Sequence, residues 1–441
     1  MSASEALISD EDTAKRRSVP LAKSLDWYGW VMVVVASLAM VATLPGRTHG
    51  LGMITERLLN DPALGLTRTV YGELNLWATL IGSLFCFGIG TLIDRYGIRL
   101  TLAGVMLALG CVVLAMTQLT SVSLLFVAIL LTRGFGQSAL SVVSITIVGK
   151  WFDRNVSLPM ALYSILMAGG FIAVALVGRQ YADADWRTLW AVIGWTVVSL
   201  AIVLTVIARD RRPPADSNWQ RATGSTLLAA TTTRAASSGR IGDFTYRQAL
   251  STAMFWVTAI GISLYGLIAA GISLFNESIL VDLGFRKEVY YESLAMGTAI
   301  GVVAKLTAGV LGIRLPLNRL LAVALGLLAA SLGWLTQLAS YTDVIIYVAI
   351  NAVSGGMLTV LFFSTWSQLY GASHLGRIQG SAQMLTVIAS AFGPMLFAQA
   401  REWQGSYHPL LWLLATAVLL NAVIAWFTPP PRIPVTQETL V

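Results

Sequence analysis

The stretch GTLIDRYGIR, residues 90–99, places three charged residues between two long apolar segments. Residues 74–93 before it carry no charge, and neither do residues 100–131 after it. A membrane-spanning helix needs about 20 predominantly apolar residues, so each segment is long enough to cross a bilayer. The stretch is therefore expected to form a tight turn at a membrane surface, between two spanning helices.

The turn contains residues suited to close packing. Gly90 allows close helix approach, and Gly97 allows a positive φ. Asp94 lies beside Arg95 and Arg99 in the sequence and offers an ion pair that latches neighbouring helices. A merely solvated loop would also account for these charges.

Composition supports a polytopic membrane protein. Hydrophobic residues make up 56% of the 441-residue chain, charged residues only 12%, and the mean hydropathy is +0.72. Soluble globular proteins carry about 25% charged residues. Cys86 and Cys111 lie in apolar segments and are expected to be small core residues. No His, Cys or carboxylate cluster lies at mid-span, so we expect no metal, no cofactor and no enzymatic activity.

The sequence predicts an all-α membrane fold of twelve helices in two six-helix, pseudo-symmetric bundles. Helices 2 and 3 flank the 90–99 turn, and the others span about 27–59, 123–149, 158–177, 189–207, 253–280, 294–312, 317–338, 344–366, 378–400 and 410–427. The bundles are expected over 27–207 and 250–428, with tails at 1–26 and 429–441. The segment 208–249 is rich in Arg, Ala, Ser and Thr and is expected to be a linker.

The distribution of positive charge predicts the orientation. Of the 29 Lys and Arg, 19 fall on the side of the termini, the 90–99 turn and the linker, and seven fall on the opposite side. The positive-inside rule therefore predicts that both termini and the linker are cytoplasmic, in a plasma membrane. It also explains the net charge of +7 without a nucleic-acid partner.

The two halves contain a weak internal repeat. Gly90, Leu92 and Arg95 match Gly309, Leu311 and Arg314 at an offset of 219, and Lys150-Trp151-Phe152 aligns near Gln368-Leu369-Tyr370. Transporters are often built from such repeats, with the substrate site between them near the bilayer midplane. A chance match of Gly and Leu is the alternative.

Three cations remain inside the predicted spans: Arg47, Arg133 and Lys305. An ionisable residue within a span is costly, so each is a functional hypothesis. No carboxylate lies at a comparable depth, since Glu73 and Glu277 are near helix ends. Unbalanced positive charge in a low dielectric favours an anionic ligand.

Arg133 is followed by Gln137, Ser141 and Ser144 on one face of the predicted helix 4. This polar stripe faces protein or water rather than lipid. Arg133 either holds helix 4 against backbone carbonyls of a neighbour or takes part in coupling and gating, and Arg133 and Gln137 are also candidates for binding the substrate.

Lys305 shares a helix face with Gly297, Gly301 and Gly309, which allow a ligand or another helix to approach closely. It is a candidate for binding the substrate. The alternative is that it extends to the cytoplasmic surface, because Arg314 is only roughly 13 Å further along the helix.

Arg47 and His49 follow Pro45 in LPGRTHG, where a break in helix 1 is expected to free backbone groups for a substrate. The alternatives are an interfacial arginine and a structural histidine, although His49 is also able to titrate near neutral pH. Weaker candidates for the site are Tyr163 on helix 5, Asn351 on helix 10 and Gln383 on helix 11.

The order Gly-x-Leu-x-Asp-Arg-x-Gly-x-Arg at 90–99 resembles the signature loop of the major facilitator superfamily, and Arg133 with Gln137 resembles its helix 4 motif. Several further residues look like its monocarboxylate and oxalate/formate branch. They are Asp26, Trp30, the Pro-Gly-Arg at 45–47, Lys-Trp-Phe at 150–152, Asp-Trp-Arg at 185–187 and Phe-Trp at 255–256.

The resemblance implies roles for particular residues. It implies that a basic residue in helix 8, here Lys305, binds the substrate carboxylate, together with the basic residue after the helix 1 proline, here Arg47. The acid that monocarboxylate members carry one turn earlier is replaced by Gly301. Proton coupling would therefore need Glu277 or His49 in its place.

These observations predict a secondary transporter of a small organic anion, with a monocarboxylate as first candidate, working by alternating access as a monomer. Proton symport and exchange are both open. The rival hypotheses are an exporter of hydrophobic or drug-like compounds and a non-transporting membrane sensor or scaffold. Uncompensated interior positive charge disfavours cationic compounds, and no signalling module is evident.

Overall fold

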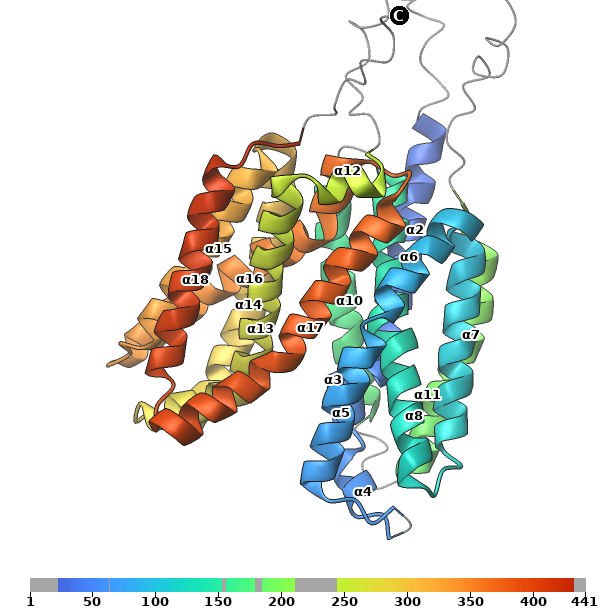
Figure 1. Cartoon of the computed structure of the whole chain (residues 1–441), viewed down its shortest axis with the longest axis horizontal. Helices are drawn as coiled ribbons and strands as arrows, with labels where there is room; N and C mark the ends of the chain where they lie inside the picture. The colour runs from blue at the N-terminus through green and yellow to red at the C-terminus, as the bar shows by residue number, and fades with distance from the viewer. Residues whose placement is uncertain (1–22, 63, 153–155, 179–184, 211–243, 432–441) are drawn as a thin grey trace, which may run out of the picture.

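The computed structural model describes residues 23–62, 64–152, 156–178, 185–210 and 244–431, and the regular secondary structure in these ranges is helical (Figure 1). The first set of helices comprises α2 (Lys23–Val41), the 3₁₀ turn η1 (Leu44–Gly46), α3 (Thr48–Gly52), α4 (Thr55–Leu59), α5 (Arg68–Gly82), α6 (Phe85–Tyr96), α7 (Ile98–Met116), α8 (Val122–Thr132), the π-helical η2 (Arg133–Leu140), α9 (Ser141–Trp151), α10 (Ser157–Gly178) and α11 (Trp186–Ile207). The second set comprises α12 (Tyr246–Leu250), α13 (Ala253–Asp282), α14 (Lys287–Arg314), α15 (Leu317–Leu335), α16 (Tyr341–Tyr370), α17 (Leu375–Gln404) and α18 (His408–Phe427).

Eleven helices in the described ranges are long and apolar enough to cross a membrane. Two of them combine consecutive elements: Val70–Tyr96 joins α5 to α6, and Val122–Trp151 joins α8, η2 and α9. The shorter apolar helix Trp27–Val41 occupies the position of the first predicted span. The predicted all-α membrane fold is confirmed, and the count agrees with about twelve helices.

The predicted break in helix 1 is present. α2 ends at Val41, and Pro45 is the second residue of the single turn η1. Its missing N–H costs nothing there, because an N–H in a first turn has no partner within the helix. At Gly46 a side chain would collide with the backbone oxygen of Thr132, at the end of α8. Glycine therefore lets the broken helix lie directly against the junction of α8 and η2.

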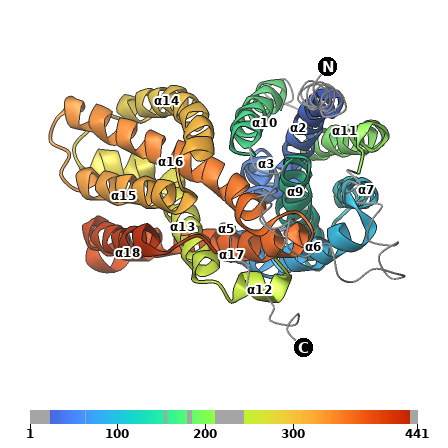
Figure 2. The ribbon, with the colours of Figure 1, turned by 90° about the horizontal axis from the view of Figure 1, so that it is seen from above.

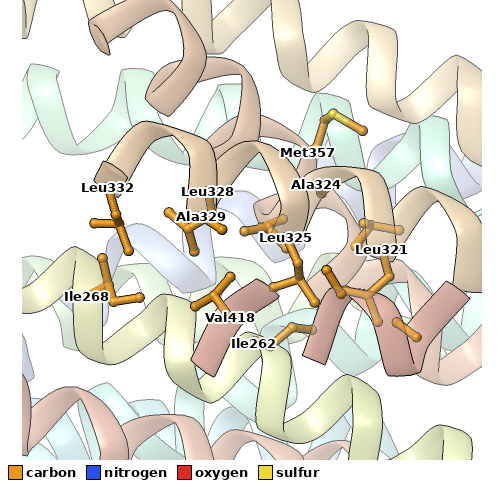
Figure 3. Packing of buried hydrophobic residues seen from close by; sticks show 14 of the residues in the cluster. Ile262, Ile268, Leu321, Ala324, Leu325, Leu328, Ala329, Leu332, Met357 and Val418 are labelled. Atoms are coloured by element: carbon orange, nitrogen blue, oxygen red, sulfur yellow. The ribbon is translucent and has the colours of Figure 1, made fainter. Parts of the chain in front are cut away.

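The buried hydrophobic side chains form two clusters, one almost entirely from each set. In the cluster of the second set, Leu325 and Leu332 of α15 face α13 and α18 (Figure 3). Ile268 lies on α13 and Val418 on α18. Lipid tails are as apolar as leucine, so close packing rather than burial from water holds these helices together.

The two sets meet at one end of the molecule, which we call the terminal side (Figures 1 and 2). It is the end where α2 begins, where α11 ends and α12 begins, and where α18 ends. The predicted linker and tails lie mostly outside the described residues.

Glycines bring the two sets together on the terminal side. A side chain at Gly90 of α6 would collide with the backbone of Gly376 on α17, and one at Gly380 would collide with the Cys86 carbonyl. A side chain at Gly309 of α14 would lie 2.7 Å from the Cβ of Ala161 on α10. The close approach predicted for Gly90 is therefore confirmed. Gly97 has a positive φ, as predicted, with a value of 84°.

Away from the terminal side the same helix faces separate. Ile172 lies three turns after Ala161 on the same face of α10, yet 52% of its surface is exposed. A Cβ at Gly301, two turns before Gly309 on α14, would meet no atom within 4 Å. The two sets thus close on the terminal side and part toward the opposite side, as Figure 1 shows.

Candidate functional site

Arg133 begins the π-helical segment η2 and is 5% exposed. Its Nη1 donates to Gln137 Oε1 at 2.7 Å and to Thr48 Oγ1 at 3.3 Å, and its Nη2 donates to Asn75 Oδ1 at 2.9 Å. Its Nε is buried with no hydrogen-bond partner in the described structure. Arg133 is therefore held by neutral side-chain oxygens and not by the backbone carbonyls that the structural alternative expected.

Arg47 lies at the end of η1 and is turned into the first set rather than to an outer surface. Its Nε donates to Thr43 Oγ1 at 2.7 Å, and its Nη2 lies 3.0 Å from Ser141 Oγ and 2.9 Å from the Met40 sulfur. Its Cζ is 5.5 Å from the ring centre of Phe171. All of these partners are uncharged groups of the first set, so Arg47 has no carboxylate beside it among the described residues.

Tyr163 of α10 is fully buried beside this arginine. Its hydroxyl lies 2.8 Å from Ser144 Oγ, which donates to the Ala36 carbonyl at 2.7 Å. Its ring meets Phe363 of α16 edge to face, with centroids 5.1 Å apart. Tyr163 therefore lies where the first set touches the second.

Lys305 of α14 lies one turn from Gly309, on the helix face that meets α10. Its side chain is partly buried, and no hydrogen bond or ion pair joins it to any described residue. The predicted glycine face is present, with Gly309 in contact and Gly301 facing open space. Lys305 thus lies between the two sets, just beyond the point where they close.

The 90–99 turn does latch helices, but not through its own arginines. Asp94 pairs with Lys150 of α9 at 3.1 Å and accepts hydrogen bonds from the backbone N–H groups of Gly376 and Arg377, at 3.2 and 3.1 Å. The N–H groups in the first turn of a helix have no partner within it and carry partial positive charge, so they bind a carboxylate.

The predicted partners Arg95 and Arg99 lie elsewhere, and this part of the prediction was wrong. Arg95 is exposed and stacks on Tyr96 at 5.3 Å, whereas Arg99 Nε donates to the Thr205 carbonyl at 2.9 Å. Helix geometry turns both side chains away from the α17 terminus that Asp94 faces.

The remaining predicted site residues are not all brought together. Asn351 accepts from Ser331 of α15 at 3.4 Å, which fits helix packing within the second set. Gln383 of α17 is 8% exposed, and its Oε1 has no partner in the described structure. Glu277 is partly buried on α13, near the end remote from the terminal side. The side chain of His49 lies outside the described part.

Sequence reasoning missed several partners. Asn75 and Thr48 are distant in sequence from Arg133, and Phe171 lies two turns from Tyr163 on α10. The spacing Tyr163, Met167 and Phe171, at four-residue steps, was a signal for the last of these. No group of three or more metal-ligating side chains occurs among the described residues.

The profile of the Major Facilitator Superfamily matches residues 21–394 of this sequence. The chain belongs to the Major Facilitator Superfamily. It is a multi-pass membrane transporter of small molecules and not an enzyme. No curated protein matches the sequence.

Solved structures share the superfamily fold. The human organic anion transporter MFSD10 (TETRAN) has a TM-score of 0.62 at 14% identity, over 92% of this chain and 100% of that one. The transporter FucP in the outward conformation has a TM-score of 0.63 at 12% identity, over 91% and 100%. The proton:xylose symporter XylE bound to 6-bromo-6-deoxy-D-glucose has 0.65 at 14%, over 93% and 97%. At these identities the likeness shows the fold alone.

Proposed function

We propose that this superfamily member is a secondary active transporter of a small organic anion, with a monocarboxylate as first candidate. It works by alternating access, as a monomer, in a plasma membrane with both termini in the cytoplasm. Residues 27–207 and 250–428 act as two bodies joined by the linker 208–249, and they rock about a site between them.

One observation carries the proposal. Arg47, Arg133 and Lys305 lie within the membrane-spanning bundle, and no described carboxylate pairs with any of them. Arg47 and Arg133 contact only neutral groups, and Lys305 has no polar partner. A carboxylate ligand would supply the missing negative charge, and in a low dielectric that attraction is large.

The arginines and the lysine take different parts in this proposal. Three of the five guanidinium N–H groups of Arg133 donate to protein oxygens and a fourth is buried, so Arg133 positions Asn75 and Gln137 and couples closure to loading. Arg47 makes no hydrogen bond through Nη1 to a described residue, and Lys305 makes none through Nζ. These two groups bind the carboxylate, Lys305 as a point charge without the bidentate fork of arginine.

The terminal side faces the cytoplasm in this proposal, because the chain's positive charge is concentrated there. The structure is then closed to the cytoplasm and parted toward the outside, as in an outward-facing carrier. Asp94 stabilises the outward-facing state by bonding the start of α17.

Proton coupling is the second step of the proposal. Gly301 occupies the place of the helix 8 acid that the monocarboxylate branch carries. Glu277 or His49 is the proton acceptor if the transporter is a symporter. Exchange of one anion for another needs no such group.

Uptake into liposomes tests the function. The parent is expected to exchange at least one external labelled monocarboxylate for the same acid inside, from a series that runs from formate and L-lactate to phenylacetate. Lys305→Gln and Arg47→Gln are each expected to reduce that exchange at least tenfold, because each removes a cation that binds the carboxylate. The matched control is Arg319→Gln, which removes an exposed cation over Trp426 on the terminal side.

Two results would contradict the proposal. One is parental exchange by correctly inserted Lys305→Gln and Arg47→Gln variants. The other is transport of a neutral sugar such as L-fucose or D-xylose with no response to any organic acid. Binding without counterflow would favour the sensor or scaffold alternative.

A further inference from the structure

Three large side chains form a stripe along one face of α10. Tyr163, Met167 and Phe171 follow one another at four-residue steps, which places them on the same side of the helix. Tyr163 is fully buried, whereas Met167 and Phe171 are partly buried and pack against the core of the first set. The stripe therefore runs from the closed contact toward the parted side.

Aromatic rings from the second set lie at the Tyr163 end of this stripe. Phe363 of α16 meets Tyr163 at 5.1 Å and its neighbour Phe362 at 5.2 Å. Phe362 is partly buried and packs against both hydrophobic clusters, and Met384 of α17 packs against the cluster of the first set. Two elements of the second set thus contact the cluster of the first set, one with an aromatic ring and one with a thioether.

The two candidate carboxylate-binding groups border this apolar surface. Arg47 Cζ lies 5.5 Å from the centre of the Phe171 ring. Helices α10 and α14 run antiparallel, because Gly309 meets Ala161 and Gly312 meets Ser157. Lys305, one turn before Gly309, therefore lies about 6 Å along α14 from that contact, level with residues near Tyr163.

We propose that the transported anion carries an apolar tail of about the size of a phenyl ring, and that Phe171 and Phe362 determine this specificity. This inference rests on the proposed function, since it concerns the apolar part of an anion whose carboxylate binds Arg47 and Lys305. With the carboxylate at Arg47, the rest of the molecule lies along Met167 toward Phe362. Methyl, carboxyl or hydroxyl tails would leave that apolar surface without a partner.

The test compares acids that differ only in the tail. Dissociation constants of acetate, phenylacetate and succinate are measured with the purified full-length protein by thermal shift or calorimetry. Phenylacetate is expected to bind roughly 30-fold or more tightly than acetate, from the added buried apolar area. Phe171→Leu and Phe362→Leu are each expected to lower that ratio about fivefold, by loss of ring packing.

The ratio of the acetate and phenylacetate dissociation constants, measured in one preparation, does not depend on the fraction of folded protein. Phe126→Leu is the matched control, because Phe126 is a partly buried ring of α8 on the same cluster and makes no ring contact with the second set among the described residues. It is expected to leave the ratio of acetate to phenylacetate binding unchanged.

The outcomes separate this inference from the proposed function. Equal binding of acetate and phenylacetate, or tighter binding of succinate than of phenylacetate, overturns the tail assignment and leaves an anion transporter. Binding of the neutral 2-phenylethanol as tightly as phenylacetate supports the apolar subsite but overturns the anionic substrate. A ratio insensitive to both Phe→Leu substitutions overturns the role of these two residues.

Discussion

Lys150 Nζ lies 3.1 Å from Asp94 Oδ1, and the same carboxylate accepts backbone N–H groups from the second set of helices. The ion pair within the first set therefore orients the acid that bonds the start of α17. This combination joins the two sets on the terminal side, and its loss should favour the state in which that side opens.

Asp94→Asn is expected to populate the opened state more. The change removes the ion pair with Lys150 and weakens the interaction with the N-terminus of α17. Together these losses destabilise the closed state by about 1–2 kcal/mol, which raises the population of the opened state roughly 5- to 30-fold. Cys86 reports the change, because it is fully buried with its carbonyl against Gly380. In a Cys111→Ser background, alkylation of Cys86 by N-ethylmaleimide should accelerate.

Asp282→Asn is the control for this experiment. Asp282 pairs with Arg401 at 2.9 Å within the second set, away from the contact between the sets. Its loss should leave Cys86 alkylation unchanged. An Asp94→Asn protein that labels at the parental rate would show that this carboxylate does not hold the terminal side closed.

Gly376→Ala is expected to disrupt the same contact by steric means. A Cβ at this position would lie 2.5 Å from the Gly90 carbonyl oxygen and 2.9 Å from Asp94 Oδ1. Backbone cannot retreat as a flexible side chain can, so about 1–3 kcal/mol of destabilisation of the closed contact is expected. The measurement is again the rate of Cys86 alkylation, together with substrate exchange, which should fall.

Gly333→Ala provides the comparison for that substitution. Its added Cβ would lie 3.6 Å from the nearest atom of Trp412, an ordinary contact within the second set. Equal effects of the two alanine variants on alkylation would mean that the Gly90–Gly376 approach has no special part in closure.

Asn75→Asp is expected to inhibit transport while stabilising the fold. Asn75 Oδ1 accepts from Arg133 Nη2 at 2.9 Å, and a carboxylate there would form a charge-assisted bond with that guanidinium. The melting temperature should rise by a few degrees, and exchange should slow, because an intramolecular anion competes with the substrate for positive charge. Faster exchange in Asn75→Asp would contradict the coupling role given to Arg133.

Much of the fold is readable from the sequence because its signals are local. Pro45, followed by Gly46 and Gly50, predicts the break in helix 1, and the apolar segments on either side of Asp94 predict two spans. The weak internal repeat also has a structural counterpart. Gly90 and Gly309 each contact the opposite set, so the repeated glycine serves the same packing purpose twice.

The candidate site is less readable because its contacts are distant in sequence. Asp94 pairs with Lys150, 56 residues away, while two nearer arginines point elsewhere. The π-helical segment that begins at Arg133 changes which side chains share a face, so a regular helix does not predict that Ser141 bonds Arg47. Only the packed helices bring these residues together.

The central claim is that Arg47 and Lys305 await a negatively charged ligand, and comparing an acid with its uncharged isostere tests it most directly. Binding of phenylacetate and phenylacetamide to the purified protein should be measured at the same ionic strength, in the parent and in Lys305→Gln. The acid is expected to bind at least tenfold more tightly than the amide in the parent, and Lys305→Gln is expected to remove most of this preference. Equal affinity for acid and amide in the parent would contradict it.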